Sequence, residues 1–432
     1  YNVSLESRIL QGAFADHRRG RALNRTWADK RVGIPRIHAI HFPLESYTPL
    51  ALSLVRFAGA VVTNYVTPTG GGAFDGSSWE NARSNIQEAI DACPDAGSVL
   101  FLKEGVYSNT ASLVISNHPG LTIRGGYEGV GAPGDFADTP SILTRDTNVA
   151  MRILSGFDST VTLDRVTVSN GLALLGGGAY LTNCYTLVTN CTIANNMIVN
   201  NNARGGGVYA MGGNLTVIDS LVKENADSAY HSTQHGAGLY VAKAIVVISD
   251  VTFEKNALSG YISEYGGALY VNGGTATVFN CTFISNSVIT GHSGGEGAFG
   301  GAVYASAATL LTFSNCVFLG NYAYISLDPA KCYGNAFNFY NVAQARIEDC
   351  VIRDNYTDGV LSPDIWIDSN GSTVIENSRL GAGSGRGIYK KGTGSLALTN
   401  CLIHVYPGHG IEAGAGSIAL ANCTLADNGG WG

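Results

Sequence analysis

A short pattern recurs ten times between residue 165 and the C-terminal end of this 432-residue chain. A full copy holds an Asn or Asp, a small residue, any residue, an aliphatic or aromatic residue and, three positions later, an Asn, as in NCTIANN (190–196) and NCTFISN (280–286). Copies begin 22 to 35 residues apart, and a second pattern, typified by GGALY (266–270), runs in step with them. Two motifs that stay in phase indicate a chain built from repeated units.

The length of the repeat excludes several kinds of repeat architecture. Units of 22 to 35 residues are shorter than a propeller blade, and the chain lacks the long 3.6-residue periodicity of helical repeats. Within a copy the side chains alternate as in a strand, so that Cys281 and Phe283 point one way and Thr282 and Ile284 the other. We therefore predict an all-β fold: a right-handed parallel β-helix, or solenoid, of about twelve coils.

Stacked coils place equivalent residues about 4.8 Å apart in columns. The small residue of the motif predicts one inward column, which is Cys191, Ser220, Val251, Cys281, Cys316, Cys350, Ser378, Cys401 and Cys423. The aliphatic or aromatic residue predicts a neighbouring column, which is Ile193, Val222, Phe253, Phe283, Phe318, Ile352, Ile403 and Leu425. Thiols in such a column act as small apolar groups, so we expect them to be reduced and buried.

The asparagines that end the motif are predicted to form a structural ladder at a turn. Each amide can bond to the copies above and below it, and Asn tolerates the left-handed backbone that turns require. The ladder comprises Asn196, Asn225, Asn256, Asn286, Asn321, Asn355 and Asn428.

The N-terminal part of the chain has two features of its own. Residues 84–87 read as a capping box, and Ile86, Ala89, Ile90 and Cys93 follow helical spacing, which predicts a short capping helix before a strand at 98–103. Residues 1–61 are arginine-rich and then apolar, which suggests an N-terminal extension that is either signal-like or irregular. We assign 62–432 to the β-helix domain and expect it to be truncated at its C-terminal end.

Segment 75–107 (DGSSWENARSNIQEAIDACPDAGSVLFLKEGVY) resembles the entry segment of right-handed parallel β-helix proteins of the pectate-lyase-like superfamily. The paired GGA-x-Y and NCTF-x-x-N motifs resemble the repeats of secreted bacterial β-helix proteins and of polymorphic outer-membrane proteins. The resemblance covers about 62–432 and implies the fold. It leaves function open, because the shared residues are stacking residues and the superfamily includes polysaccharide lyases, hydrolases, adhesins and surface passengers.

The loops between the ladder asparagines and the glycine motif are longest in the middle of the stack, so they should project side by side. Acid–base groups beside aromatic rings suit a sugar-binding surface. The candidate ligand-binding residues are Tyr230, Tyr261, Tyr265, Tyr322, Tyr324 and Tyr333, and the candidate catalytic residues are His235, His292, Glu296 and Lys331. The alternative is that these loops are purely structural.

Two further groups of charged residues receive no functional role. Asp354, Asp358, Asp364 and Asp368 form an acidic group, but strand geometry separates Asp364 from Asp368 by about 13 Å. We therefore predict no metal site and no cofactor, with Ca²⁺ as the ion that such oxygen ligands would take. Lys390, Lys391, His404 and His409 form a basic group that we interpret as a solvated edge.

Composition narrows the function classes. With 26 basic against 33 acidic residues and only 14% charged residues, the chain lacks the basic surface of a nucleic-acid binder, and no long uncharged apolar run predicts a membrane span. We expect a secreted or cell-surface protein with a structural or adhesive role that binds polysaccharide or cell-surface glycan and associates end to end or laterally. The alternative is a polysaccharide lyase or glycoside hydrolase.

Overall fold

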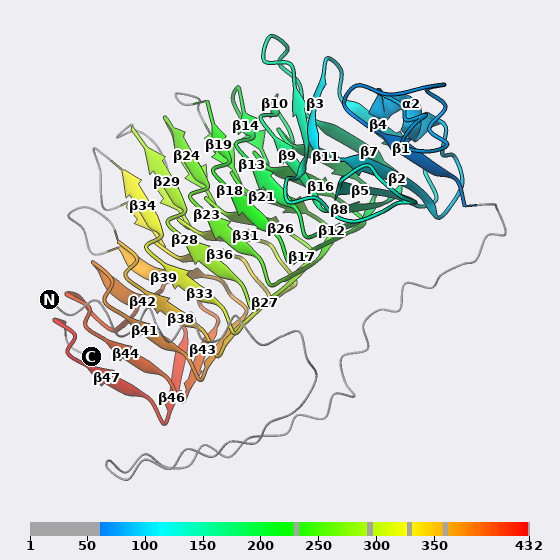
Figure 1. Ribbon diagram of the computed structural model, residues 1–432. Helices are drawn as coiled ribbons and strands as arrows, with labels where there is room; N and C mark the ends of the chain where they lie inside the picture. Colours follow the sequence, from blue (N-terminus) through cyan, green and yellow to red (C-terminus); the bar gives the residue numbers. More distant parts are fainter. Residues whose placement is uncertain (1–60, 229–232, 292–296, 326–330, 357–361, 431–432) are drawn as a thin grey trace, which may run out of the picture. The chain divides into compact units, whose positions relative to one another are not determined.

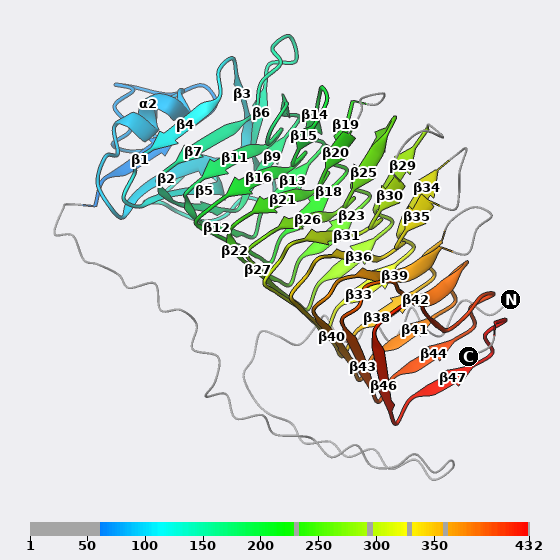
Figure 2. The same ribbon diagram turned by 180° about the vertical axis from the view of Figure 1, so that it is seen from behind.

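The computed structural model describes residues 61–228, 233–291, 297–325, 331–356 and 362–430. In this part the chain winds into stacked coils, and every sheet is built from parallel strands of successive coils (Figures 1 and 2). The all-β prediction and the parallel β-helix are confirmed. Except for Val61, the extension predicted for 1–61 lies outside the described residues. No helix in the described ranges is long and apolar enough to cross a bilayer.

Three long sheets form the faces of the solenoid. Sheet A contains β1 (Thr63–Val66), β2 (Ser98–Lys103), β5 (Leu121–Tyr127), β8 (Thr160–Asp164), β12 (Tyr185–Thr189), β17 (Asn214–Ile218), β22 (Ile245–Ser249), β27 (Thr275–Phe279), β32 (Leu310–Ser314), β37 (Gln344–Glu348), β40 (Ser372–Glu376), β43 (Ser395–Thr399) and β46 (Ser417–Ala421). Sheet B contains β3 (Gly105–Asn109), β6 (Ser141–Arg145), β9 (Val166–Ser169), β13 (Thr192–Ala194), β18 (Leu221–Lys223), β23 (Thr252–Glu254), β28 (Thr282–Ile284), β33 (Val317–Leu319), β38 (Val351–Arg353), β41 (Arg379–Gly381), β44 (Leu402–His404) and β47 (Thr424–Ala426). Sheet C contains β4 (Leu113–Ser116), β7 (Leu154–Phe157), β11 (Ala179–Thr182), β16 (Val208–Met211), β21 (Leu239–Ala242), β26 (Leu269–Asn272), β31 (Val303–Ser306), β36 (Phe337–Tyr340), β39 (Pro363–Asp368), β42 (Arg386–Lys390) and β45 (Ile411–Ala413).

Two shorter sheets project from the middle of the stack and form what we call the flange. Sheet D contains β10 (Leu172–Ala173), β14 (Met197–Ile198), β19 (Ala226–Asp227), β24 (Ala257–Gly260), β29 (Ser287–Thr290) and β34 (Tyr322–Ile325). Sheet E contains β15 (Ala203–Arg204), β20 (Thr233–His235), β25 (Ser263–Tyr265), β30 (Gly297–Phe299) and β35 (Cys332–Tyr333). In each mid-stack coil the chain leaves sheet B along sheet D and returns along sheet E to sheet C. The segments expected to be loops are therefore partly strands.

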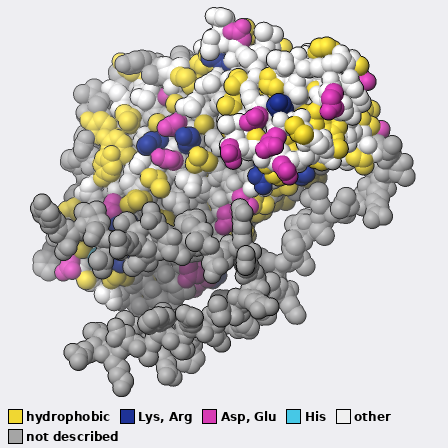
Figure 3. Space-filling view, viewed as in Figure 1, with side chains coloured by type: hydrophobic (Ala, Val, Ile, Leu, Met, Phe, Trp, Pro, Cys, Tyr) yellow, Lys and Arg dark blue, Asp and Glu magenta, His cyan; other side chains and the backbone are white. Residues whose placement is uncertain are grey.

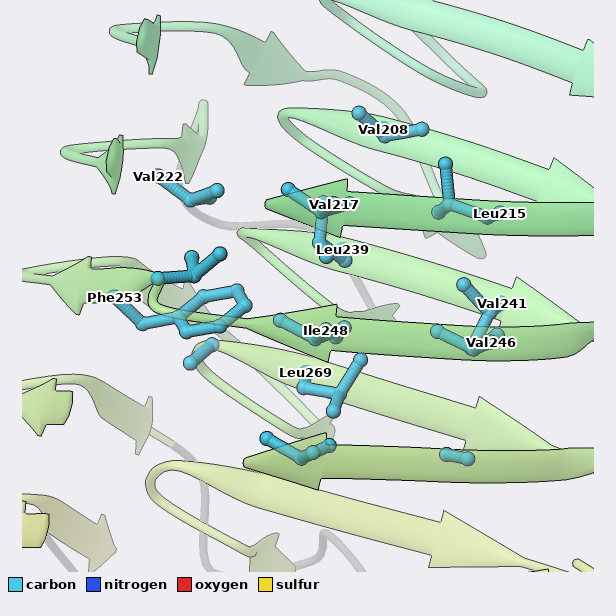
Figure 4. Close-up of a cluster of buried hydrophobic side chains, with 14 of the residues drawn as sticks. Val208, Leu215, Val217, Val222, Leu239, Val241, Val246, Ile248, Phe253 and Leu269 are labelled. Atoms are coloured by element: carbon cyan, nitrogen blue, oxygen red, sulfur yellow. The ribbon is translucent and has the colours of Figure 1, made fainter. Parts of the chain in front are cut away.

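The interior of the coils is apolar and its residues lie in register. Figure 4 shows Val217, Ile248 and Phe253 among the side chains that pack between the sheets. The phenylalanine column is continuous, because Phe283 stacks on Phe253 and Phe318 with ring centroids 4.7 and 4.5 Å apart. The predicted inward columns are thus present. Cys191, Cys281, Cys316, Cys350 and Cys401 are buried, and all nine cysteines are unbridged.

Six of the seven ladder asparagines form one hydrogen-bonded column. Nδ2 of each donates to Oδ1 of the next over 2.9–3.0 Å, from Asn196 through to Asn355. These six side chains are fully buried. Asn428 lies apart from this run, where its Oδ1 accepts the Tyr406 amide over 3.1 Å.

The left-handed backbone is found at other positions than we expected. The ladder asparagines do not adopt positive φ. The residues before them do, as Asn195 (φ 56°) and Lys255 (φ 52°) illustrate, and so do motif-opening residues such as Asn190 and Asp250. Asn and Asp tolerate this conformation best, which explains why they open the motif.

The glycine motif is explained by close packing of successive coils. A Cβ atom on Gly207 would lie 2.5 Å from the carbonyl oxygen of Gly238 in the next coil. Such a contact is too short for any side chain, so the backbone can stack here only without one.

The predicted capping helix is α2 (Ile86–Asp91), and its N-cap is Asn85, whose side chain accepts the amides of Gln87 and Glu88. Ile86, Ala89, Ile90 and Cys93 are buried against the coil interior, as their spacing predicted. The helix lies between β1 and β2 in the chain, so one strand precedes the helix that covers the end of the stack.

Candidate functional site

A column of rings runs along the outer face of sheet C. The tyrosines of the glycine motif occupy equivalent positions in successive strands and stack at 4.8–5.1 Å; they are Tyr180, Tyr209, Tyr240, Tyr270 and Tyr304. The last four are buried. Burial raises the pKa of the Tyr270 and Tyr304 hydroxyls, so both stay protonated at neutral pH.

A second column lies on sheet E and packs against the first. His235, Tyr265, Phe299 and Tyr333 stack with ring centroids 4.6–5.1 Å apart. Tyr265 also meets Tyr304 edge-on at 4.9 Å, which joins the two columns. The angle between the flange and sheet C is therefore filled with rings. Because the rings cover each other's faces, few of those faces are left for a ligand.

The arrangement changes where the flange ends. Asn338 replaces the tyrosine of sheet C, and its Nδ2 donates to the carbonyl of Tyr333 over 2.8 Å. The sheet E column then continues onto sheet C, because Tyr333 contacts Trp366 at 4.7 Å and Trp366 contacts Tyr389 at 4.5 Å. The interplanar angle of 67° between Tyr333 and Trp366 breaks the face-to-face stack, and the Trp366 and Tyr389 side chains are both partly exposed.

Charged groups surround these two rings. Glu412 follows Trp366 and Tyr389 in the same row of sheet C. Its carboxylate lies 2.9 Å from Nε of Arg386 and 3.9 Å from Nε2 of His409. On the other side, Nζ of Lys391 donates to Asp368 over 2.8 Å. We call these seven residues the C-terminal patch: Trp366, Asp368, Arg386, Tyr389, Lys391, His409 and Glu412.

Charged side chains are sparse on the face that Figure 3 shows, where they lie singly or in small groups among uncharged ones. Lys255 and Glu254 form one ion pair on sheet B, 3.2 Å apart. In the C-terminal patch two ion pairs adjoin the partly exposed rings of Trp366 and Tyr389.

The structure divides the residues that the sequence proposed as one surface. Tyr265 and Tyr333 lie in the sheet E column, while Tyr322 and Tyr324 stack at 5.6 Å on sheet D. Tyr261 is 46% exposed near the start of β25. Lys331 is partly buried just before β35. Tyr230, His292 and Glu296 lie outside the described residues.

His235 has an environment that disfavours acid–base work. Burial lowers the pKa of its imidazole to about 3, and the nearby Arg204 adds to the effect. The ring stacks on Tyr265 and stays neutral above about pH 4, where a base of such low pKa accepts protons poorly.

The acidic group does not assemble around one point. Asp364 is completely buried and accepts the Tyr406 hydroxyl over 2.7 Å. Asp354 pairs with Arg353 on an exposed edge, Asp368 pairs with Lys391, and Asp358 lies outside the described residues.

The interpretation of the basic group as a solvated edge is wrong for Lys390. Its side chain is fully buried, and Nζ donates to the carbonyl oxygens of Gly392 and Ala415. His404 accepts a hydrogen bond of 3.1 Å from Nε of Arg379, and Nε2 of His409 lies 3.9 Å from the Glu412 carboxylate. The basic residues therefore belong to different local environments.

Sequence reasoning missed Phe299, Trp366, Tyr389, Arg386 and Glu412. Tyr389 ends a GIY segment (387–389), and strand pairing places it in the same row of sheet C as the buried tyrosines. Trp366 is not preceded by the glycines of the second repeated pattern, so the pattern did not identify it. Arg386 and Glu412 lie in different coils, so their proximity is not visible in the sequence. Only the register of β39, β42 and β45 brings them together.

Comparisons with known proteins find one family and several distant likenesses. No curated protein matches the chain. Among solved structures, the pectate lyase Pel9A matches at 14% identity with a TM-score of 0.37, covering 85% of this chain and 80% of that one. ORF18 of Geobacillus virus E2 matches at 13% identity with a TM-score of 0.35, covering 79% of this chain and 57% of that one. A GH87 alpha-1,3-glucanase from Streptomyces thermodiastaticus matches at 13% identity with a TM-score of 0.30, covering 87% of this chain and 69% of that one.

Likenesses this distant say nothing about activity. The family model described as "Right handed beta helix region" matches residues 152–318 and 296–432, which is more than half of the chain. Its matches span the regular coils, the flange and the C-terminal patch. The chain therefore belongs to the family of right-handed β-helix proteins.

Proposed function

We propose that the protein binds an extended glycan chain across the C-terminal patch. The observation that supports this is the pair of partly exposed rings, Trp366 and Tyr389, which follow the 67° change of ring orientation between Tyr333 and Trp366. Aromatic rings pack against the apolar C–H faces of sugars and lose little conformational entropy on binding.

Polar groups on both sides of the rings supply orientation. Arg386 and Glu412 lie at one end, and Asp368 and Lys391 flank the rings on sheet C. Charged donors and acceptors of this kind form strong hydrogen bonds to sugar hydroxyls. Trp366, Tyr389 and Glu412 lie in successive coils, so the row covers roughly 10 Å along the axis and suits a polymer better than a single small metabolite.

This proposal fits a structural or adhesive protein that is secreted or displayed at a cell surface. Its support is the regular, charge-poor stack, in which a long rigid body presents one localised contact patch. In this interpretation the described ring columns of the flange stiffen the middle of the stack, and the patch makes the contact.

A second candidate function is polysaccharide cleavage by a lyase or hydrolase. It is favoured by the convergence of Arg386, His409 and Glu412 from two adjacent coils, because cleavage requires proton-transfer groups close to a charge-neutralising one. In this alternative Glu412 and His409 transfer protons, and Arg386 contacts an anionic sugar.

Retention of the protein in native gels that contain acidic or neutral polysaccharides tests the binding proposal. Trp366→Ala should abolish retention on the polysaccharide that slows the parent protein. Tyr185→Ala is the matched control, since Tyr185 is 56% exposed on sheet A, away from the patch. Retention that survives Trp366→Ala and Tyr389→Ala contradicts the proposal.

The same samples separate binding from cleavage. A lyase releases unsaturated products that absorb in the ultraviolet, and a hydrolase releases reducing ends. If the protein only binds, neither signal rises above that of the Glu412→Gln variant. Turnover that Glu412→Gln removes, with retention preserved, favours the enzyme instead.

A further inference from the structure

The interior of the flange is largely apolar. Its core consists of Ile198, Ala203, Ala237, Leu258, Val288, Ala298, Ala323, Ile325 and Cys332. Among these residues three strongly polar side chains point inward: Asp227 from sheet D, and Gln234 and Glu264 from sheet E. Gln234 and Glu264 are fully buried, and Asp227 is 7% exposed.

Strand register brings Gln234 and Glu264 together. They are direct partners in the pairing of β20 with β25, so their side chains project from neighbouring coils into the same space. Asp227 lies on β19, in the sheet that packs across the flange interior from sheet E. Its Oδ1 accepts the amide of Ser259 over 2.9 Å, which fixes the carboxylate.

The polar atoms on the sheet E side are poorly satisfied within the described part of the chain. Both amide atoms of Gln234 are buried there without a hydrogen-bond partner, and no side chain donates a hydrogen bond to the Glu264 carboxyl, whose neighbouring donor is the backbone amide of Gln234. Buried polar groups are nearly always paired, and an unpaired carboxylate is among the most costly exceptions. The two side chains do not satisfy each other, so a further group is needed between them.

Two buried carboxyl groups face the same space at this place. Glu264 is fully buried, Asp227 is 7% exposed, and the negative charge of Asp227 acts on the Glu264 carboxyl. The basic side chain of Arg204 on sheet E is directed elsewhere, since its guanidinium lies 5.5 Å from the ring centroid of Tyr240 in the sheet C column. A positive charge placed between the two carboxyl groups would therefore stabilise both.

We propose that Asp227, Gln234 and Glu264 form a binding site for a hard divalent cation of the calcium class. Two carboxylates balance a charge of +2, and with the Gln234 amide oxygen they offer up to five oxygen ligands. Calcium accepts six to eight oxygens in flexible geometry, including amide oxygens, whereas magnesium prefers to keep several waters, for which an apolar interior has little room.

The donor set also excludes softer metals. Asp227, Glu264 and the Gln234 amide offer oxygen donors alone, and oxygen donors do not select zinc or copper. The cation would tie sheet D to sheet E and stabilise the flange independently of glycan binding.

Thermal unfolding and calorimetric titration of the whole chain test this site. After treatment with a chelator and its removal, addition of Ca²⁺ should raise Tm by about 2–5 °C and titrate with one ion per chain. Glu264→Gln and Asp227→Asn should each lose the shift and the binding heat. Asp250→Asn, at an exposed position in an adjacent turn, should keep both.

The opposite results would overturn the proposal. If millimolar Ca²⁺ neither binds nor shifts Tm, or if binding persists in Glu264→Gln, no such site exists. A stability that ignores Ca²⁺ but rises on acidification, and is made pH-independent in that range by Glu264→Gln, would show that a proton compensates Glu264. Should Glu264→Gln fold poorly, Gln234→Ala provides the second test, since it removes a ligand without changing charge.

Discussion

The hydroxyl of Tyr406 donates a hydrogen bond of 2.7 Å to Oδ2 of Asp364, inside the solenoid and across 42 residues of sequence. Tyr406 occupies the turn position that a ladder asparagine fills in earlier coils. Its ring passes beside Gly383, where a Cβ atom would lie 2.6 Å from the ring. A buried carboxyl and its phenol thus replace the amide ladder where the flange ends.

This pair predicts a pH-dependent stability. Burial raises the pKa of the Asp364 carboxyl to about 7, above its ordinary value near 3.8. Between these values the folded state binds more protons than the unfolded state, so stability falls as pH rises through this window, with a slope of up to about 1.4 kcal/mol per unit. Urea unfolding from pH 4 to 8 should show this slope, and Asp364→Asn should remove the part of it that this carboxyl contributes. Asp354→Asn, an exposed change of the same kind, should leave it in place.

The asparagine ladder predicts an unusually costly polar-to-alanine change. Asn286 donates to Asn321 and to the carbonyl of Phe253, and its own oxygen accepts from Asn256. Asn286→Ala leaves several buried groups unpaired, at about 1–3 kcal/mol for each. In chemical denaturation, Asn286→Ala should therefore lower the free energy of unfolding about as much as Phe283→Ala, for which the cavity costs about 3–5 kcal/mol. Thr282→Ala on the outer face is the control, and a near-neutral Asn286→Ala would contradict the structural role of the ladder.

The thiol column predicts a sharp contrast between native and denatured protein. All nine cysteines are unbridged, and eight are buried. Burial raises the pKa of the Cys191 thiol to about 12, which suppresses the reactive thiolate. Thiol titration should find nine groups in denaturant and about one in the native state, which Cys423→Ser should remove. Stable disulfides in the mass spectrum would contradict this arrangement.

The C-terminal patch predicts a spectroscopic signal. The chain has four tryptophans, of which Trp366 lies in the patch and Trp79 is buried in the N-terminal coils. A bound glycan should change the fluorescence of Trp366, and Trp366→Phe should abolish the change while keeping an aromatic contact. Arg386→Gln should weaken binding roughly 10-fold if Arg386 bonds to the sugar. An unchanged titration in Trp366→Phe would show that the fluorescence reports on another part of the chain.

The amino-acid sequence by itself determined the parallel β-helix, the inward columns of Cys281 and Phe283, and the ladder through Asn286, because these depend on a local pattern repeated once per coil. It also located the mid-stack projections, but not that Tyr265 and Tyr322 belong to different sheets of a flange with its own core.

Only the tertiary structure decided which residues form the C-terminal patch and the polar site around Glu264. Arg386, Glu412 and Trp366 come from three strands of sheet C, and Gln234 meets Glu264 only when β20 pairs with β25. Loop lengths change from coil to coil, so sequence spacing alone does not give this register. Backbone hydrogen bonds between coils fix it and thereby decide which side chains become neighbours.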